Sequence, residues 1–256
     1  MKSIPFALPV IFCVVLAGCG TTGATKSFVL PIDPTIVEGI ERNIHAGGIV
    51  VADDANIVIA AGTNPWGVFG ESDRSNLEQS LEQTLRVLDK YSTDLSLPAW
   101  TVEVLLRRHV IAHDNNSAGL LVCVAWALKS EAGDVVYENQ FYGADSVALV
   151  GTIGGLKNSV NKAVVQRIVE SAVRLASSKS IDGVSVRNTY DTLDEAASTL
   201  PERYRSLPVV IYSNSRASIL GADLSTGGIS VVQPNDAAVK TVDWQTLEPT
   251  DPVTWE

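Results

Sequence analysis

Three consecutive apolar runs near the middle of the chain constrain its fold more than any other feature of the sequence. They span residues 100–111, 120–128 and 135–142 and are rich in valine, leucine, tyrosine and phenylalanine. The first run alternates in polarity, with Val102, Val104, Leu106 and Val110 on one face and Thr101, Glu103, Arg107 and His109 on the other. One face of this strand is therefore expected to be buried and the other at least partly wet. Short connections favour pairing between neighbours, so the three runs predict an antiparallel meander.

Two stretches with helical periodicity flank the meander. The first, residues 75–91, starts with Ser75 and Glu78 at the spacing of a capping box, and its leucines recur every three or four residues. The second, residues 156–176, carries one apolar stripe of Val160, Val164, Ile168, Ala172 and Leu175. The predicted fold class is α+β: a mostly antiparallel sheet with a three-strand meander, two helices packed on one face and an irregular C-terminal extension.

The segments before the first helix have shorter patterns. Residues 36–44 predict one or two helical turns that end at Gly47-Gly48. The runs 49–52 and 57–60 are β-branched and are separated by turn-forming residues. They predict either a hairpin or two consecutive strands.

The pattern after the second helix is less regular. Residues 193–205 predict a helix interrupted at Pro201, and residues 209–212 and 229–232 predict short strands. Residues 233–256 hold several prolines and are expected to be extended or disordered.

The N-terminus has the layout of an export signal. Lys2 supplies a basic start, residues 4–15 form an apolar core, and Leu16, Ala17 and Gly18 lead to Cys19. An apolar core of about a dozen residues is shorter than the roughly 20 that a helix needs to cross a bilayer, so a permanent membrane span is not expected. An ordinary secretory signal, in which Cys19 is incidental, is the alternative.

The sequence Leu16-Ala17-Gly18-Cys19 resembles the lipobox of bacterial lipoproteins. The resemblance implies that residues 1–19 are a lipoprotein signal peptide and that Cys19, carrying acyl chains such as palmitate, becomes the mature N-terminus. Several acyl chains hold a protein stably at a bilayer, where a single chain binds only marginally. Position 20 is Gly and no Asp follows Cys19, which by the same resemblance implies the outer membrane, facing the periplasm.

The layout of residues 1–177 is similar to that of small bacterial envelope lipoproteins. The shared features are a Gly/Thr tether, a first helix near residues 77–88, a meander carrying Gly133-Asp134-Val135-Val136-Tyr137, and a closing helix from about Leu156. Lipopolysaccharide-assembly lipoproteins and auxiliary lipoproteins of ABC-type transport systems are similar in layout. The resemblance implies a non-catalytic accessory or scaffold of an envelope assembly or transport complex, with an envelope protein as partner.

Together these patterns divide the chain into four parts. They are the signal peptide 1–19, a flexible tether 20–35, an α+β domain 36–179, and a C-terminal extension 180–256 with a proline-containing tail.

Charge and cysteine content exclude two further possibilities. The chain has 29 acidic and 19 basic residues, a formal net charge of −10, and no basic cluster, so nucleic acid is not an expected partner. Cys13 lies in the segment to be removed and Cys19 is the expected lipid site. Cys123 is left in an apolar run as a buried, unreactive thiol, and no disulfide is expected within the domain.

Three patterns resemble catalytic or binding motifs, and each has a plainer explanation. His109 and His113 would share a strand face, but no third ligand is near, so surface imidazoles are expected rather than a metal site. Residues 151–155 are rich in Gly but lack the Lys of a phosphate loop, and they predict a flexible connection into a helix. The acid pairs Asp53-Asp54 and Asp194-Glu195 predict a turn and a helix start.

No catalytic residue, cofactor or metal ligand is therefore assigned, and an enzyme is not expected. Two alternative functions stay open. One is a carrier of lipid or small molecules with a groove between sheet and helices, and the other is a hydrolase that uses His109 or His113.

Three of the five tryptophans are candidates for partner contacts. Trp66 lies in a predicted loop, and Trp244 and Trp255 lie in the C-terminal tail. Exposed aromatic side chains often mark binding surfaces. The alternative is that these side chains fold back onto their own domain.

Overall fold

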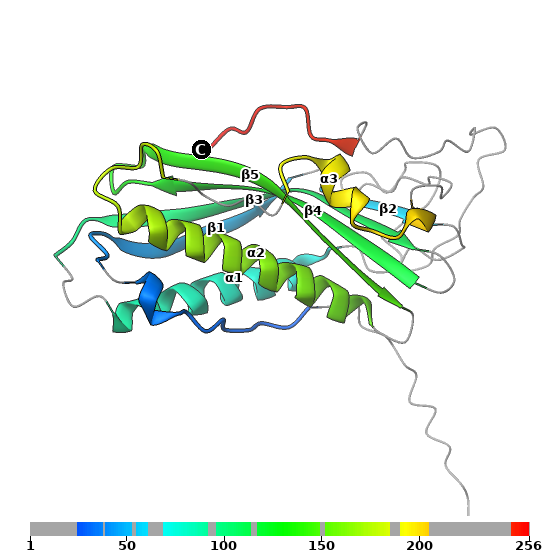
Figure 1. Ribbon diagram of the computed structural model, residues 1–256, viewed down its shortest axis with the longest axis horizontal. Coiled ribbons are helices and arrows are strands. Elements are labelled where there is room, and N and C mark those ends of the chain that lie inside the picture. The colour runs from blue at the N-terminus through cyan, green and yellow to red at the C-terminus, as the bar shows by residue number, and fades with distance from the viewer. Residues whose placement is uncertain are drawn as a thin grey trace, which may run out of the picture.

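The computed structural model forms one sheet with two long helices on one of its faces (Figure 1). It describes residues 25–37, 39–52, 55–60, 69–91, 96–113, 117–148, 152–184, 190–204 and 247–255, with only the backbone at 36, 56–60 and 113. Within these ranges, no helix combines the length and the apolar character needed to cross a membrane. The strand order is β1-β3-β4-β5, and β2 also pairs with β3. The predicted α+β class is confirmed.

The longest strands form the predicted antiparallel meander. β3 (Ala99–His113), β4 (Ser117–Lys129) and β5 (Val135–Ala148) follow one another across the sheet. β4 is buried along its whole length, which explains why its sequence is apolar on both faces. The turn from β4 to β5 is closed by a hydrogen bond of 2.9 Å from the Ser130 N–H to the Asp134 carbonyl.

Two parallel strands complete one edge of the meander. β1 (Asn43–Val51) pairs with the first part of β3, and β2 (Asn56–Ala60) pairs with its last part. The prediction of two consecutive strands is confirmed and the alternative of a hairpin is wrong, because both strands run in the same direction along one partner. A parallel pair needs a long crossover, and the helix α1 (Glu71–Arg86) lies in this connection.

The helical turns predicted over residues 36–44 are wrong. Among the described residues before β1, only Pro34–Ile36 form a helical turn, of the 3-10 type, and β1 continues through Gly47-Gly48. The register of β1 on β3 shifts between Ala46 and Gly48, so Gly47 is the extra residue of a bulge. Gly47 allows β1 to approach β3 closely, and neither glycine ends a helix.

We expect Gly47→Ala to lower the free energy of unfolding by about 1–3 kcal/mol, the usual cost of overpacking. A Cβ atom at Gly47 would lie 2.7 Å from Cγ2 of Thr101 and 3.1 Å from the backbone carbonyl oxygen of Val102. Gly48→Ala is the matched control, because a Cβ atom there would meet nothing within 4 Å. Urea denaturation measures both variants, and equal midpoints would contradict this close approach.

A second bulge exchanges the two faces of β3 over the last part of the strand. The register of β3 on β4 shifts between Leu106 and Arg108. The predicted alternation is confirmed up to Leu106 and is wrong beyond it, because one inserted residue exchanges the two faces. Val110 therefore faces away from the long helices, and His109 faces toward them.

The two long helices, α1 (Glu71–Arg86) and α2 (Ile153–Ala176), pack on one face of the sheet as predicted. α1 begins earlier than expected, and Asp73 rather than Ser75 caps it. A carboxylate oxygen of Asp73 accepts a hydrogen bond of 3.0 Å from the Gly70 N–H.

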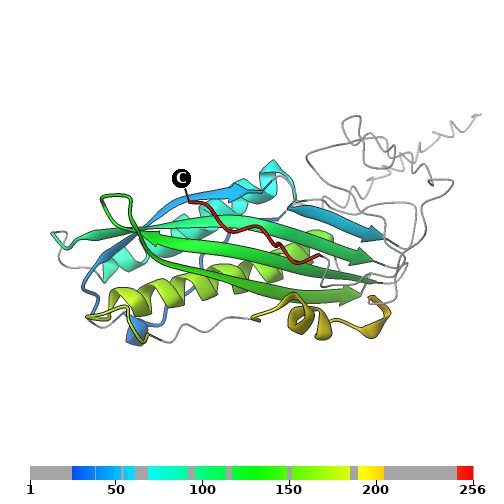
Figure 2. The same ribbon diagram turned by 90° about the horizontal axis from the view of Figure 1, so that it is seen from above.

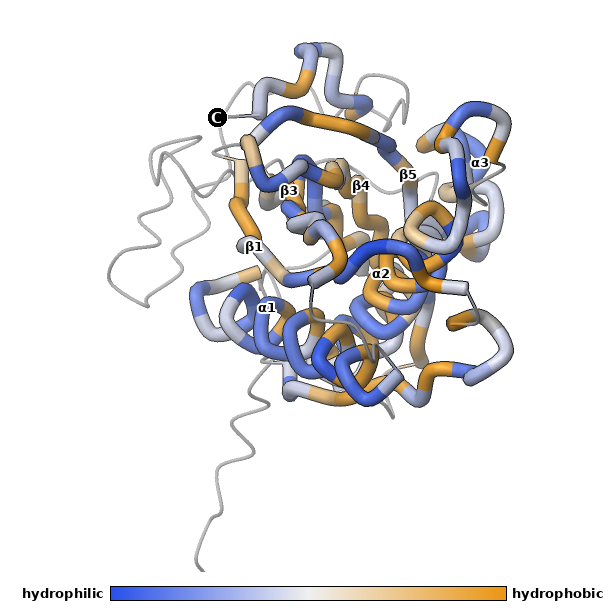
Figure 3. The backbone as a smooth tube through the Cα atoms, turned by 90° about the vertical axis from the view of Figure 1, so that its left-hand side faces the viewer, coloured by the Kyte–Doolittle hydropathy of each residue, from blue (hydrophilic) through white to orange (hydrophobic). Residues whose placement is uncertain are grey.

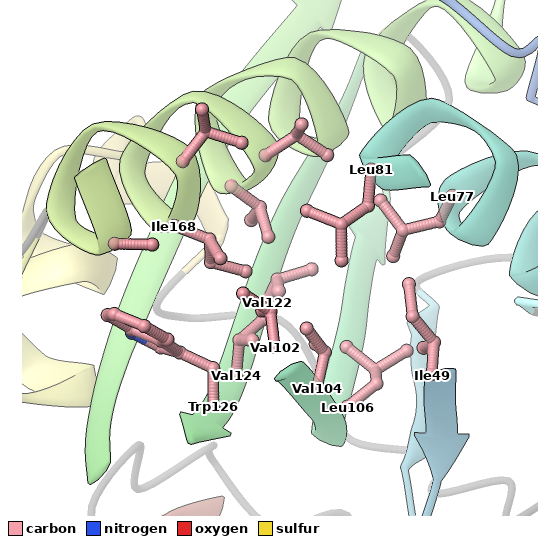
Figure 4. Close-up of a cluster of buried hydrophobic side chains, with 14 of the residues drawn as sticks. Ile49, Leu77, Leu81, Val102, Val104, Leu106, Val122, Val124, Trp126 and Ile168 are labelled. Carbon is pink, nitrogen blue, oxygen red and sulfur yellow. The ribbon is translucent and has the colours of Figure 1, made fainter. Parts of the chain in front are cut away.

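Figure 3 shows α1 and α2 lying together beneath the strands. Buried apolar side chains of both helices and of the sheet form one core cluster between them. In Figure 4, Leu77 and Leu81 of α1 and Ile168 of α2 point toward Trp126 and the other core side chains of the sheet. Each of these four side chains is at most 2% exposed. The predicted carrier groove between sheet and helices is thus occupied by the protein's own side chains.

The opposite face of the sheet, called the outer face below, carries a smaller apolar cluster. α3 (Leu193–Ser198) and the 3-10 turn Glu202–Tyr204 cover it, with the predicted interruption at Pro201 between them. The cluster consists of Val110, Ala112, Leu121, Cys123, Tyr142, Leu193, Ala196, Ala197, Leu200, Tyr204 and Leu247. The strands predicted at residues 209–212 and 229–232 lie outside the described residues.

Candidate binding surface

The C-terminal residues 247–255 run along the outer face of the sheet (Figure 2). Arg107 of β3 holds them there. One guanidinium nitrogen donates a hydrogen bond of 2.5 Å to Oε1 of Gln140, and another donates to the backbone carbonyl of Asp251. The planar guanidinium group suits this double role, and its hydrogen bonds offset the cost of burying it to 9% exposure.

Both ends of this C-terminal segment are attached. Near its start, Oε1 of Glu248 accepts a hydrogen bond of 2.9 Å from the N–H of Leu193, the first residue of α3. Near its end, Nε1 of Trp255 donates a hydrogen bond of 3.0 Å to Oε2 of Glu138 on β5. Trp255 is half-buried, so it folds back onto its domain and still presents part of its ring.

A cavity of about 590 Å³ opens beside Trp255, toward β1. Its lining includes Gly48, Val50, Glu103, Leu105 and Trp255, which together we call the Trp255 surface. Val50 is 61% exposed, the highest value among the large apolar side chains that the structure describes. A second cavity, of about 610 Å³, lies between the C-terminal segment and β3, β4 and β5. Volumes of this size suit a small ligand or the anchoring side chains of a partner.

A buried polar centre lies on the other side of the sheet, under the long helices. Nζ of Lys157 lies 2.9 Å from Oδ2 of Asp73, and these side chains are 1% and 4% exposed. The ring of His109 packs edge-on against Phe69, with 5.2 Å between the ring centroids. Burial, and then the positive charge of Lys157, lower the pKa of His109 well below its usual value of 6.5. This imidazole is therefore neutral at neutral pH.

The position of His109 corrects the prediction of a surface imidazole. The β3 bulge turns it into the core, where it is 1% exposed and beyond the reach of a substrate from solvent. The side chain of His113 lies outside the described residues. In the part of the chain that the structure describes, no three His, Cys, Asp or Glu side chains gather as metal ligands would.

Cys123 is buried as predicted, and this burial raises the pKa of its thiol to about 12, which keeps it protonated and unreactive. The flexible connection predicted over residues 151–155 is wrong for residues 153–155, which form the first turn of α2. Thr152 caps this turn by accepting a hydrogen bond of 3.0 Å from the Gly155 N–H. Asp194 and Glu195 lie in the first turn of α3.

Several predicted site residues lie outside the described residues. They are Leu16, Ala17, Gly18 and Cys19 of the lipobox, the candidate contacts Trp66 and Trp244, and the acid pair Asp53-Asp54.

The residues that hold the C-terminal segment could not be predicted from the sequence. Arg107 and the Asp251 carbonyl are 144 residues apart in the chain, and Trp255 and Glu138 are 117 apart. The buried ion pair could not be predicted either, because Lys157 is followed by two polar residues, Asn158 and Ser159, and stands in no apolar run.

Comparison of the sequence with models of protein families and with curated proteins found no match. Among solved structures, the chain is similar to a presumed lipoprotein from Caulobacter crescentus, at 11% identity over 56% of this chain and 96% of that chain, with a TM-score of 0.33. A presumed homologue of the neuraminyllactose-binding hemagglutinin from Helicobacter pylori has 12% identity, covers 57% of this chain and 91% of its own, and has a TM-score of 0.32. The lipoprotein GNA1162 from Neisseria meningitidis has 13% identity, covers 50% and 99%, and has a TM-score of 0.21. The similar structures thus include bacterial lipoproteins, at TM-scores too low to carry an argument about function.

Proposed function

We propose that this chain is a bacterial lipoprotein, anchored by acylated Cys19 at the periplasmic face of the outer membrane. It acts there as a non-catalytic accessory or scaffold of an envelope assembly or transport complex. The export signal and the lipobox sequence support the anchor. The Trp255 surface is the partner-binding site, and the observation that carries this assignment is the half-buried Trp255 beside a cavity of about 590 Å³.

The occupant that fits this surface is an extended segment of a protein partner. The outer face already binds one extended segment, residues 247–255 of this chain, through a backbone carbonyl and a tryptophan side chain. A second extended segment beside it would cover the exposed side chain of Val50 and the open part of the Trp255 ring. Buried tryptophans with an adjacent pocket are frequent hot spots of protein interfaces.

Photo-crosslinking in the native envelope tests this proposal. A photoreactive amino acid at Val50, 61% exposed, should capture one protein, and Trp255→Ala should weaken its binding by about 2 kcal/mol, or about 30-fold in Kd. Val29 is the matched control position. It is 51% exposed and lies in a segment bound to α1, on the other side of the molecule. Two results would contradict the assigned surface. One is capture of the same proteins at both positions, and the other is capture at Val50 that is unchanged by Trp255→Ala.

A carrier of lipid or small molecules is the second candidate. The cavity of about 590 Å³ favours it, because ligand sites commonly have volumes of roughly 300–1,000 Å³. Mass spectrometry of the full-length protein, purified from its own membranes in mild detergent, distinguishes the two functions. One lipid or small molecule retained in stoichiometric amount, lost in Trp255→Ala and unaccompanied by a protein, would replace the accessory function with the carrier function. Cys19→Ala controls for lipid held only by the anchor.

A further inference from the structure

The N-terminal residues 25–33, which we call the strap, are bound to the helices on the side away from the sheet (Figure 1). Backbone N–H groups of the strap donate hydrogen bonds of 2.7–3.2 Å to side chains of α1. The pairs are Thr25 to Asp73, Phe28 to Ser80 and Leu30 to Thr84. The Lys26 N–H donates a further bond of 2.9 Å to Asn158 of α2.

α1 carries a polar stripe for this contact. Asp73, Asn76, Ser80 and Thr84 recur every three or four residues, next to the leucine stripe that faces the sheet. Asn76 returns a hydrogen bond of 2.9 Å to the Thr25 carbonyl. Ser80 and Thr84 have no exposed surface, and buried hydroxyl groups of this kind need partners, which the strap supplies.

The strap is therefore part of the folded domain. Thr25 itself is only 4% exposed, and Ile32 belongs to the main core. Of residues 20–35, for which the sequence predicted a flexible tether, the described residues from Thr25 to Ile32 are fastened to the helices.

We propose that the strap fixes which end of the molecule faces the bilayer. The end where α1 and α2 begin lies against the membrane, and the turn Ser130–Asp134 is the outermost point. This inference rests on the proposed acylation of Cys19. Thr25 follows Cys19 by six residues, and six residues span at most about 20 Å in any conformation. Because Thr25 is bonded to Asp73, the start of α1 stays within that reach.

The opposite end of the molecule lies well beyond this distance. β5 ends just before α2 begins, so its last residue, Ala148, belongs to the membrane-facing end. β5 has 14 residues, which places Val135 at its start about 40 Å away. The net charge of −10 disfavours lying flat on anionic lipids, which keeps the far end away from the surface.

Energy transfer from single-site labels to labelled lipids tests this orientation. The full-length acylated protein is placed in vesicles of phosphatidylethanolamine and phosphatidylglycerol with a fluorophore on Ser72→Cys or on Val135→Cys. Both positions are exposed, whereas Cys123 is buried and its thiol stays protonated. Transfer from position 72 should exceed transfer from position 135 by at least about two-fold, given a separation of about 40 Å. Equal transfer from the two positions overturns the proposal.

Two variants test whether tether length and strap cause the difference. About 20 Gly and Ser residues inserted after Thr22 should equalise the two signals, because the short reach is lost. Asn76→Ala combined with Asn158→Ala removes the hydrogen bonds to the Thr25 carbonyl and the Lys26 N–H, which hold the strap at its first residues, and should shrink the difference while circular dichroism stays unchanged. A difference that persists in both variants overturns the role of the strap.

Failure of the anchor itself gives a separate result. Vesicle flotation and the mass of the N-terminal peptide report acylation directly. A chain that does not float and has an unmodified Cys19 refutes the proposed function, whereas an acylated, floating chain with equal signals refutes only the orientation.

Discussion

Asp73→Ala is expected to lower the free energy of unfolding by about 3–5 kcal/mol, the usual cost of breaking a buried ion pair by removing one partner. The change leaves the ammonium group of Lys157, 1% exposed, without its carboxylate. Burial lowers the pKa of Lys157, and Asp73 opposes that lowering. The N–H groups of Thr25 and Gly70 lose their acceptor as well. Urea denaturation at pH 7 measures the loss.

Two further variants test the origin of this loss. Asp73→Asn removes the negative charge and keeps a single acceptor oxygen, whereas the N–H groups of Thr25 and Gly70 bond to different carboxylate oxygens, Oδ1 and Oδ2, so most of the loss should remain. Asp73→Leu combined with Lys157→Met replaces the pair by apolar side chains and should recover most of the stability, because a buried pair contributes little net free energy over a packed apolar pair. A loss below about 1 kcal/mol in Asp73→Ala would show that the pair is not buried as described.

The stability of the protein is expected to fall below pH 6.5 because of His109, by up to about 1.4 kcal/mol per pH unit. Burial lowers the pKa of this imidazole well below 6.5 in the folded state, and the positive charge of Lys157 adds to the effect. Between the folded pKa and pH 6.5 the unfolded chain therefore binds more protons than the folded one. In that window stability rises with pH, and above pH 6.5 the penalty is absent.

His109→Phe removes this titration and keeps a ring against Phe69. The slope of stability against pH between 6.5 and 5 should become shallower than in the wild type, whatever the stability at pH 7. His45→Phe is the matched control, since His45 is exposed on β1. Urea midpoints measured at several pH values give the slopes. Identical slopes for wild type and His109→Phe would place His109 in contact with water.

The parts of the fold that depend on local periodicity could be predicted from the sequence. The leucines of α1 recur at helical spacing, and β4 is apolar on both faces because it lies in the middle of the sheet. The meander followed from strands joined by short turns. In each case the residues that carry the pattern are the same residues that form the element, or its neighbour in the chain.

The two bulges could not be predicted, and the one in β3 caused the error in its predicted faces. A bulge at Gly47 or after Leu106 adds one residue and leaves the apolar composition of the strand unchanged. Its consequence is nevertheless large, because every later side chain changes face. His109 was misplaced for this reason alone.

Of the residues that line the candidate surface, only Trp255 was proposed as a contact from the sequence. Its exposure in a proline-containing tail marked it as a contact, but its neighbours come from strands more than a hundred residues away. Likewise, the parallel pairing of β1 with β3 has no local signature, since Asn43 pairs with Ala99.

This parallel edge also dictates an order of folding. β1 is synthesised before β3, yet β3 is its pairing partner, 56 residues later in the chain (99 minus 43). The strands of the meander are joined by short turns, so they pair without a delay of this kind. The meander therefore forms first, and β1 and β2 then pair with its edge strand, β3. Until that happens, β1 and one side of β3 present unpaired backbone groups, which are the surfaces that pair wrongly between chains. In a crowded compartment, the risk of aggregation is therefore greatest between the synthesis of β1 and its pairing with β3.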